Sequence, residues 1–377
     1  MTPVTDQLPS EGPARDPTLR GEVVYLYAFD VANEIRLDRV ATVLSDRPVT
    51  FAVKPDRAAP RSALHSRPLA VEPPPPAARV NGLPVRLLVR VYEVGVVSVT
   101  VRAVVAVDSL AALVPFHTPT LDDGRPLDAL AREVCAEAVR GLADSLVRPG
   151  PIGDPEAYTV FALTDLAEER DVSRWLEDRR RDVAGLLTET PPDRLSDQQV
   201  DEVLRLRRSF ETIDAVVIDW DAALVIELDG YAEDVLFVLE LANLQLEEFQ
   251  WMDRVLDRYL DRAYEDLVRP RWWTFGAAAV VLRSLRRLRV DLARLADEVG
   301  HTIKFVGDWH LARVYALARE RFHLDQWRAS VAERLRQLDE LYTLTRAELY
   351  DRRMLWLEVI IVVFFAADLL LLLFGRR

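Results

Sequence analysis

Cysteine, lysine and histidine are scarce in this chain of 377 residues. The single cysteine, Cys135, excludes an internal disulfide, and with only five histidines it also excludes a cysteine-based zinc site. Two of the 48 basic residues are lysines, Lys54 and Lys304, a bias that indicates genome composition rather than chemistry. The formal net charge of -13 argues against a general nucleic-acid binder, because neutralising phosphates requires a basic surface.

The motifs that carry well-known chemistry are also missing. The chain contains no GxxxxGK, GxGxxG, HExxH, CxxC or GxSxG sequence. Residues 1–20 have no basic region followed by an apolar core, so they predict a disordered tail rather than a secretory signal. We therefore expect a protein that is not an enzyme and that uses no cofactor or metal.

Proline divides the chain into two parts, since none of the 22 prolines follows Pro270. Residues 21–228 mix β-rich runs with short helices and predict an α+β domain with a mixed sheet, ferredoxin-like or related. A charged helical insert is predicted near residues 166–210. Residues 229–353 predict long antiparallel helices that form a stalk.

Several elements of the first part can be placed from local patterns. The run EVVYLYAF at residues 22–29 predicts a strand, and residues 31–44 have helical spacing. Two β-rich runs, residues 85–93 and 96–107, flank Gly95 and predict a hairpin. Cys135 falls in a predicted amphipathic helix, where a buried and inert thiol is expected.

In the second part, apolar residues recur every three or four positions over residues 235–263, 281–299 and 331–349. Such seams require partner helices, either within the chain or between chains. The first of these helices also carries polar residues, which predict a solvated face or part of a polar seam: Glu240, Asn243, Gln245, Glu247 and Glu248.

The end of the chain, residues 354–374, reads MLWLEVIIVVFFAADLLLLLF. About 20 apolar residues span a bilayer as a helix, so this run predicts one transmembrane helix that anchors the chain by its tail. Glu358 and Asp368 interrupt the run. They either lie near the interface, protonated or touched by water, or face another helix in a homo-oligomer or complex; a helix buried in a soluble protein is the remaining interpretation.

An aromatic and basic cluster precedes the last helices. Trp272 and Trp273 are followed by Arg286 and Arg287, and this combination can rest on anionic lipid at a membrane surface. The alternative is that the tryptophans pack in a core while the arginines are solvated.

Two other groups of residues are candidate sites. Asp219 and Asp221 flank Trp220, and paired carboxylates could bind a divalent ion or serve a membrane-bound enzyme. A hairpin turn, in which aspartate accepts backbone hydrogen bonds, explains the same residues. The histidines His301, His310 and His323 are spaced too widely for one helix face, which favours polar or capping roles over a metal site.

Three C-terminal segments resemble the required-for-meiotic-nuclear-division family: GDWHLARVYALARERF at residues 307–322, VAERLRQLDELYTLTRAEL at 331–349 and LWLEVIIVVFF at 355–365. The opening YLYAFDVANEI, at residues 25–35, is a weaker match. The resemblance implies a non-enzymatic, oligomeric, membrane-tethered protein of bacterial origin. Its mitochondrial relatives support organellar translation, which implies a partner associated with ribosomes.

Together these patterns predict a tail-anchored scaffold of the bacterial inner membrane, with its large N-terminal region in the cytoplasm. The expected partners are the lipid bilayer, further copies of the chain and an unknown protein, without sequence-specific nucleic-acid binding. An ion-transport protein on a helical stalk, of the CorA type, is the alternative from another class. A single convincing span and the lack of a Gly-Met-Asn loop between two spans argue against it.

Overall fold

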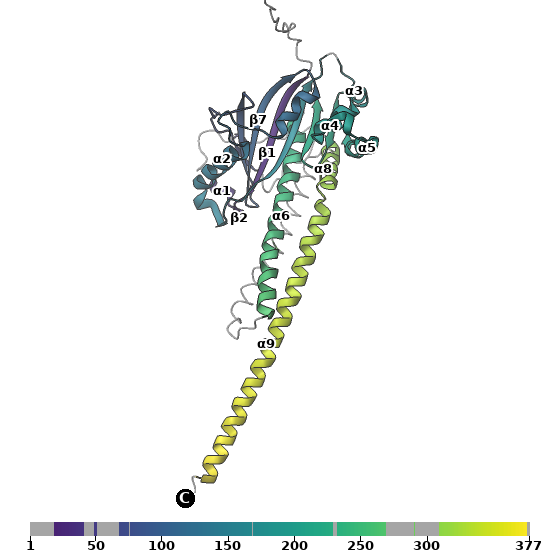
Figure 1. Ribbon diagram of the computed structural model, residues 1–377. Helices are drawn as coiled ribbons and strands as arrows, with labels where there is room; N and C mark the ends of the chain where they lie inside the picture. The colour runs from purple at the N-terminus through teal and green to yellow at the C-terminus, as the bar shows by residue number, and fades with distance from the viewer. Residues whose placement is uncertain are drawn as a thin grey trace, which may run out of the picture. The chain divides into compact units, whose positions relative to one another are not determined.

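The structure is a computed structural model that describes residues 19–40, 49–50, 68–74, 76–167, 169–228, 232–268, 290 and 309–374 (Figure 1). The chain divides into two compact units. Unit 1 comprises Met1–Glu247 and Glu298–Leu324, and unit 2 comprises Glu248–Asp297 and Asp325–Arg377. Unit 1 therefore includes residues beyond the boundary near residue 229 that the sequence predicted.

Unit 1 is a mixed α+β structure. Its strands are β1 (Leu19–Asp30), β2 (Ala32–Ile35), β3 (Val49–Thr50), β4 (Leu69–Val71), β5 (Arg79–Val80), β6 (Leu83–Val91), β7 (Val96–Val107), β8 (Leu146–Pro149), β9 (Glu156–Asp165), β10 (Arg207–Arg208), β11 (Asp214–Ile218) and β12 (Ala222–Glu227). Its α-helices are α1 (Leu37–Val40), α2 (Leu127–Gly141), α3 (Val172–Asp178), α4 (Arg180–Leu187), α5 (Asp197–Arg205), α8 (Trp309–Arg321) and the first part of α6 (Ala232–Val268). Short 3-10 helices lie at η1 (Leu110–His117), η2 (Ala143–Ser145) and η3 (Pro192–Arg194).

Ten strands form one sheet, in the order β10-β11-β12-β9-β1-β7-β6-β4-β3, with β5 paired to β6. The long strand β1 lies at its centre and pairs antiparallel with β7 and β9. The pair β9 and β12 is parallel: after β9 the chain passes through α3, α4 and α5 to β10 and β11, and the β11–β12 hairpin then brings β12 beside β9. This order is not the β-α-β-β-α-β order of a ferredoxin-like layer.

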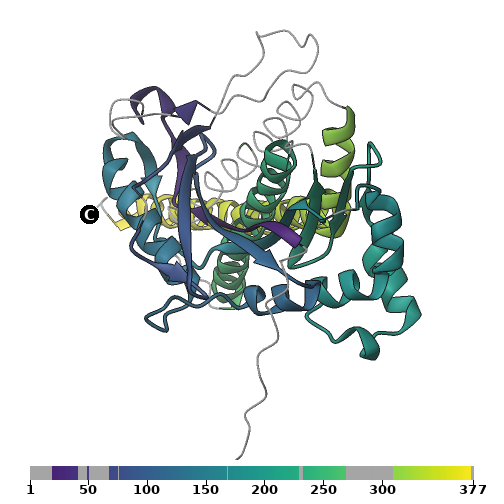
Figure 2. The same ribbon diagram turned by 90° about the horizontal axis from the view of Figure 1, so that it is seen from above.

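One face of the sheet carries the main apolar core. Alternate residues of β1, among them Tyr25 and Phe29, pack there with side chains from α2 and α4. The hydroxyl of Tyr25 donates a hydrogen bond to the carbonyl of Phe116 in η1 at 2.9 Å, which satisfies this buried polar group. Figure 2 shows α3, α4 and α5 at one end of the sheet, away from α2.

The opposite face of the sheet is covered by α6 and α8, and its contacts are more polar. Arg90 on β6 pairs with Glu240 on α6, and Tyr92 donates a hydrogen bond to the same carboxylate at 3.0 Å. Asn243 donates to the carbonyl of Glu156 on β9 at 3.1 Å. The sheet of unit 1 therefore lies between two helical layers.

Of the two interpretations of the polar residues on α6, the solvated face is wrong, whereas their buried polar contacts agree with a polar seam. Glu240, Asn243, Gln245, Glu247 and Glu248 are all 7% exposed or less. The sheet covers one side of this helix, while Tyr315 on α8 donates a hydrogen bond to Gln245 on another. Burial on several sides means that the apolar stripe read from the sequence is only part of the buried surface.

Other local predictions are confirmed or corrected. The strand at residues 22–29 and the hairpin around Gly95 are present as β1, β6 and β7. The predicted helix at 31–44 is replaced over its described part by strand β2 and the four-residue helix α1, because β2 pairs with β8. The helical insert is present as α3, α4 and α5, and Cys135 in α2 is buried as expected.

Unit 2 contains residues 248–268 of α6 and most of α9 (Leu324–Phe374). Arg334 on α9 lies 3.1 Å from the carboxylate of Asp253 on α6 and also pairs with Asp257. The buried apolar residues of this contact are Phe249, Met252, Leu256, Val331, Leu335 and Leu338. The two helices run in the same direction (Figure 1), so the predicted antiparallel relation does not hold for this pair.

Candidate functional site

The predicted Asp-Trp-Asp turn connects β11 and β12. The amide of Asp219 donates a hydrogen bond to the carbonyl of Ala222 at 2.9 Å, which closes the hairpin. The carbonyl of Asp221 accepts from the amide of Thr159 on β9 at 3.1 Å, so the turn is also tied to the neighbouring strand. The hairpin interpretation of these residues is confirmed.

The two carboxylates of this turn do not form a pair. The Asp219 side chain is buried and lies against Arg321, whereas Asp221 is exposed. Among the residues that the structure describes, no cluster of three or more aspartate, glutamate, histidine or cysteine residues is placed to hold a metal ion. The geometry therefore gives no support to a divalent-ion site built on Asp219 and Asp221.

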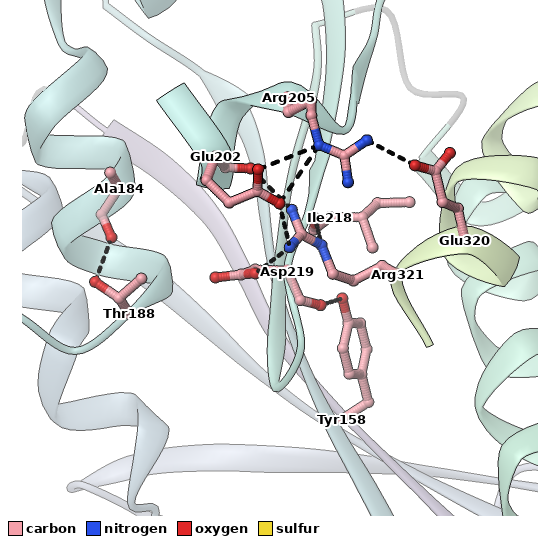
Figure 3. Close-up of polar contacts among 9 residues, drawn as sticks. All are labelled: Tyr158, Ala184, Thr188, Glu202, Arg205, Ile218, Asp219, Glu320 and Arg321. Atoms are coloured by element: carbon pink, nitrogen blue, oxygen red, sulfur yellow. Dashed lines mark hydrogen bonds and ion pairs between the residues drawn. The ribbon is translucent and has the colours of Figure 1, made fainter. Parts of the chain in front are cut away.

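Arg321 is the centre of the cluster around this turn (Figure 3). It is the last residue of α8 and is 6% exposed. Its Nε donates to the carbonyl of Ile218 at 3.1 Å, and Nη2 donates to the carbonyl of Glu202 near the end of α5, also at 3.1 Å. Its Nη1 lies 3.3 Å from Oδ1 of Asp219 and 3.7 Å from Oε1 of Glu202.

These contacts suit an arginine for a simple reason. The guanidinium presents five donors in a planar fork, so one side chain can reach carbonyls and carboxylates in several directions. The carbonyl of Glu202 belongs to the last turn of α5, where a cation also interacts favourably with the helix dipole. Arg321 thus connects the ends of α8, α5 and β11.

Tyr158 on β9 completes the buried side of the cluster. Its hydroxyl donates to the carbonyl of Asp219 at 2.9 Å, as Figure 3 shows. Its ring meets the ring of Phe322 edge to face, with centroids 5.0 Å apart. Burial raises the pKa of Tyr158 well above its ordinary value, so the hydroxyl stays protonated and remains a donor.

The charge of Asp219 is affected by opposing influences. Burial raises the pKa of its carboxyl above the ordinary value, while the nearby Arg321 lowers it in part. At the rim, Arg205 and Glu320 pair at 2.6 Å, and both side chains are about half exposed. The buried groups of this cluster direct their hydrogen bonds and ion pairs at one another.

At the C-terminal end of α8, three consecutive residues contact the β11–β12 turn or Tyr158 beside it. Arg321 pairs with Asp219, Phe322 packs on Tyr158, and the ring of His323 contacts the ring of Trp220 at a tilt of 53°, with centroids 4.9 Å apart. His323 has a φ of 51°, a left-handed conformation that interrupts the helical path between α8 and α9. We call this set the α8 anchor: Tyr158, Glu202, Asp219, Trp220, Arg321, Phe322 and His323.

A second polar contact holds the other end of α8. The buried carboxylate of Asp214 accepts hydrogen bonds from the amides of Phe210 and Glu211, and Nε2 of His310 lies 3.8 Å from it. The ring of Phe210 contacts Trp309 and His310, with both centroid distances 5.4 Å. The histidine thus has an ordinary polar role in α8, as the sequence predicted.

The sequence did not reveal the α8 anchor, although it singled out Asp219. Glu202, Arg321 and Asp219 are far apart along the chain, and nothing in their local patterns indicates that they meet. One signal was present: Arg321 falls on the same helical face as Leu311, Val314 and Leu317, which are buried. A charged residue on an apolar helix face predicts a buried partner.

The remaining predicted site residues are at the end of the chain or outside the described residues. Glu358 lies on α9 and is exposed, and Asp368 lies on the same helix, in a part without described side chains. Trp272, Trp273, Arg286 and Arg287 fall outside the described residues. Within the described part of the chain, no helix is both long and apolar enough to cross a membrane, so the predicted transmembrane helix has no structural support.

Comparison with known proteins shows a relationship in the N-terminal part of the chain. A family model described as "Uncharacterized protein MJ0711, N-terminal domain" matches residues 20–233. An uncharacterized protein, MJ0711 of Methanocaldococcus jannaschii, is 21% identical over 220 residues, which cover 58% of this chain and 66% of that protein. The match thus spans just under two thirds of the relative, and no solved structure matches.

This relationship differs from the resemblance read from the sequence. The matched residues lie in the α+β part, whereas the resemblance to the required-for-meiotic-nuclear-division family depended mainly on residues 307–365. The comparisons support an uncharacterized family, but neither that name nor a bacterial origin. With its model covering residues 20–233, the chain belongs to the family described as the N-terminal domain of uncharacterized protein MJ0711.

Proposed function

We propose that this protein is a non-enzymatic scaffold, held at the cell membrane by the end of α9, with unit 1 on the cytoplasmic side to bind a protein partner. The observation that carries the proposal is the exposure of apolar side chains on α9. All described side chains at residues 357–367 are exposed, among them Ile361, Phe364 and Phe365 at 63%, 72% and 74%. A continuous apolar surface of this kind favours association with lipid or protein.

The sequence around these residues favours lipid as the covering phase. The apolar run continues to Phe374, and α9 extends that far as a helix. A helix that is apolar on all sides is typical of a membrane environment rather than of a surface helix in water. Arginines at positions 352, 353, 376 and 377 can reach lipid headgroups from both ends.

The polar groups of unit 1 support a binding role over a catalytic one. The α8 anchor consists of groups that already satisfy one another, and Asp219 is paired with Arg321 rather than with Asp221. Side chains that already pair with one another in this way keep the surface around α8 in a fixed position. The scaffold proposal therefore assigns the α8 anchor to positioning and α9 to attachment.

Membrane extraction tests the attachment. The full chain and a chain truncated after Arg353 are expressed in the same host, and their membranes are washed with alkaline carbonate. We expect the full chain to stay in the pellet and the truncated chain to be released. A chain lacking residues 1–18 serves as the matched control for truncation and should stay in the pellet. Release of the full chain by carbonate would contradict the proposal.

A further inference from the structure

The outer surface of α8 differs from its inner surface in both composition and exposure. Leu311, Val314, Leu317 and Arg321 face inward and are buried. The exposed residues recur with helical spacing and form one stripe: Trp309, Arg313, Ala316, Arg319, Glu320 and His323. We call this set the α8 stripe.

Exposed aromatic side chains border the stripe at both ends. Trp309 and Phe210 lie at its beginning, 55% and 53% exposed, and their rings contact each other edge to face. Trp220, 50% exposed, contacts the ring of His323 at its end. Among the described residues of unit 1, the only other large hydrophobic side chain exposed to this degree is Val104. Aromatic residues are the type most enriched at protein interfaces.

These aromatic residues come from three separate segments that the fold brings together. Phe210 lies in the loop before β11, Trp220 in the turn after it, and Trp309 at the start of α8. The hydrogen bonds to Asp214 hold the first segment, and the α8 anchor holds the second. The surface is thus preorganised, which reduces the entropy lost when a partner binds.

The charge of the stripe favours a carboxylate. The Arg313 guanidinium lies over the Trp309 ring, 4.2 Å from its centroid, and no acid among the described residues pairs with it. Glu320, in contrast, already pairs with Arg205. Charges in water are screened over about 8 Å at physiological salt, so at contact the local cation outweighs the net charge of the chain.

We propose that the α8 stripe, with Phe210 and Trp220, is a docking surface for an acidic peptide segment that also carries apolar side chains. Its apolar side chains would pack against the aromatic rings, and a carboxylate would pair with Arg313. Arginine stacked on an aromatic ring keeps its donors available for such a bidentate pair. This inference deepens the proposed scaffold function and rests on its partner-binding part alone.

Selection from a displayed library of random peptides on the full chain tests the inference. The selected sequences should be enriched in Asp, Glu and aliphatic residues relative to the input. Binding of a selected peptide should fall about tenfold or more in Trp309→Ser, Phe210→Ser and Arg313→Glu, as expected for central residues of an interface. Val104→Ser removes an equally exposed apolar side chain elsewhere in unit 1 and should leave binding unchanged.

Charge reversal gives an independent measurement. Replacing the acids of a selected peptide by lysine should abolish binding to the wild type and restore part of it to Arg313→Glu. Enrichment of basic peptides, equal loss in Val104→Ser, or self-association of the chain through Trp309 in sedimentation would overturn the inference. The stripe variants should remain in carbonate-washed membranes as the wild type does, so a failure of attachment is seen separately from a failure of docking.

Discussion

Arg321 Nη1 lies 3.3 Å from Asp219 Oδ1, and both residues are almost completely buried. An ion pair in this position does not by itself show that the pair stabilises the fold, because both charges lose their hydration. Its meaning comes from the neighbours. Arg321 also donates hydrogen bonds to two carbonyls, that of Ile218 at the end of β11 and that of Glu202 in the last turn of α5.

Arg321→Met should therefore destabilise unit 1 strongly. The substitution leaves the buried Asp219 charge without its cation and removes both hydrogen bonds to the carbonyls, so we expect a loss of about 3–5 kcal/mol in the free energy of unfolding. Urea denaturation checks the value. Arg205→Met is the matched control, since the half-exposed Arg205–Glu320 pair should contribute at most about 1 kcal/mol. Similar losses in both variants would contradict the role assigned to Arg321.

Asp219 also predicts a pH dependence. Its pKa is raised in the folded state, so the folded chain holds this proton more tightly than the unfolded chain. The stabilising contribution is therefore fully present below the ordinary pKa and is lost as pH rises through the raised value. The free energy of unfolding of the wild type minus that of Asp219→Asn should decrease between about pH 3 and about pH 7. An increase over this range would contradict the raised pKa.

The sequence predicted those parts of the fold that local patterns determine. β1 was predicted from its β-branched and aromatic run, the β6–β7 hairpin from two β-rich runs around Gly95, and α2 from helical spacing, and each is present. The helix expected at 31–44 failed because Ile35 and Ala32 pair with β8, more than 100 residues away. Tertiary pairing overrode local spacing there, and no local pattern records such a partner.

The candidate site shows the same limit. Asp219 was identified as a turn residue from its neighbours, but its charge partner comes from α8, about 100 residues later. For the polar residues of α6 the sequence could not decide between a solvated face and a polar seam, because their partners, such as Arg90 and Tyr315, lie on distant elements. Buried polar groups need specific partners, and those partners are set by the tertiary fold rather than by spacing.

The buried pair of Arg90 and Glu240 gives a third prediction. Either single substitution, Arg90→Met or Glu240→Met, removes the ion pair while the other charge stays buried, and should cost about 3–5 kcal/mol. The double variant removes both charges and should lose less than either single variant, because hydrophobic residues often replace a buried pair, although the hydrogen bond from Tyr92 to Glu240 is also lost. A double-mutant cycle from urea denaturation measures the coupling. Additive losses would show that the two charges do not depend on each other.

Gly95 should not accept a side chain. It has a φ of 102°, and a Cβ placed there would lie 1.8 Å from the carbonyl oxygen of Ala32. Its own carbonyl accepts hydrogen bonds from the amides of Val31 and Ala32 at 3.0 and 3.2 Å, so the hairpin cannot move away without losing them. Gly95→Ala should cost on the order of 3 kcal/mol in thermal or urea unfolding.

Gly82 provides the control for this substitution. It also has a positive φ, 78°, but a Cβ there meets no atom within 4 Å. Gly82→Ala should therefore cost only about 1 kcal/mol, the usual effect of the backbone conformation alone. Equal losses at the two glycines would show that the close approach to Ala32 is not what restricts Gly95.

The thiol of Cys135 should be unreactive in the folded chain. It is fully buried in α2, and burial raises its pKa to about 12. At pH 8 roughly one thiol in ten thousand would then be ionised, and the thiolate is the reactive form. Ellman's reagent should therefore react very slowly with the native protein and rapidly in concentrated urea. Because Cys135 is the only cysteine, the absorbance reports on this one site. Rapid reaction of the native chain would show that α2 opens readily from the core.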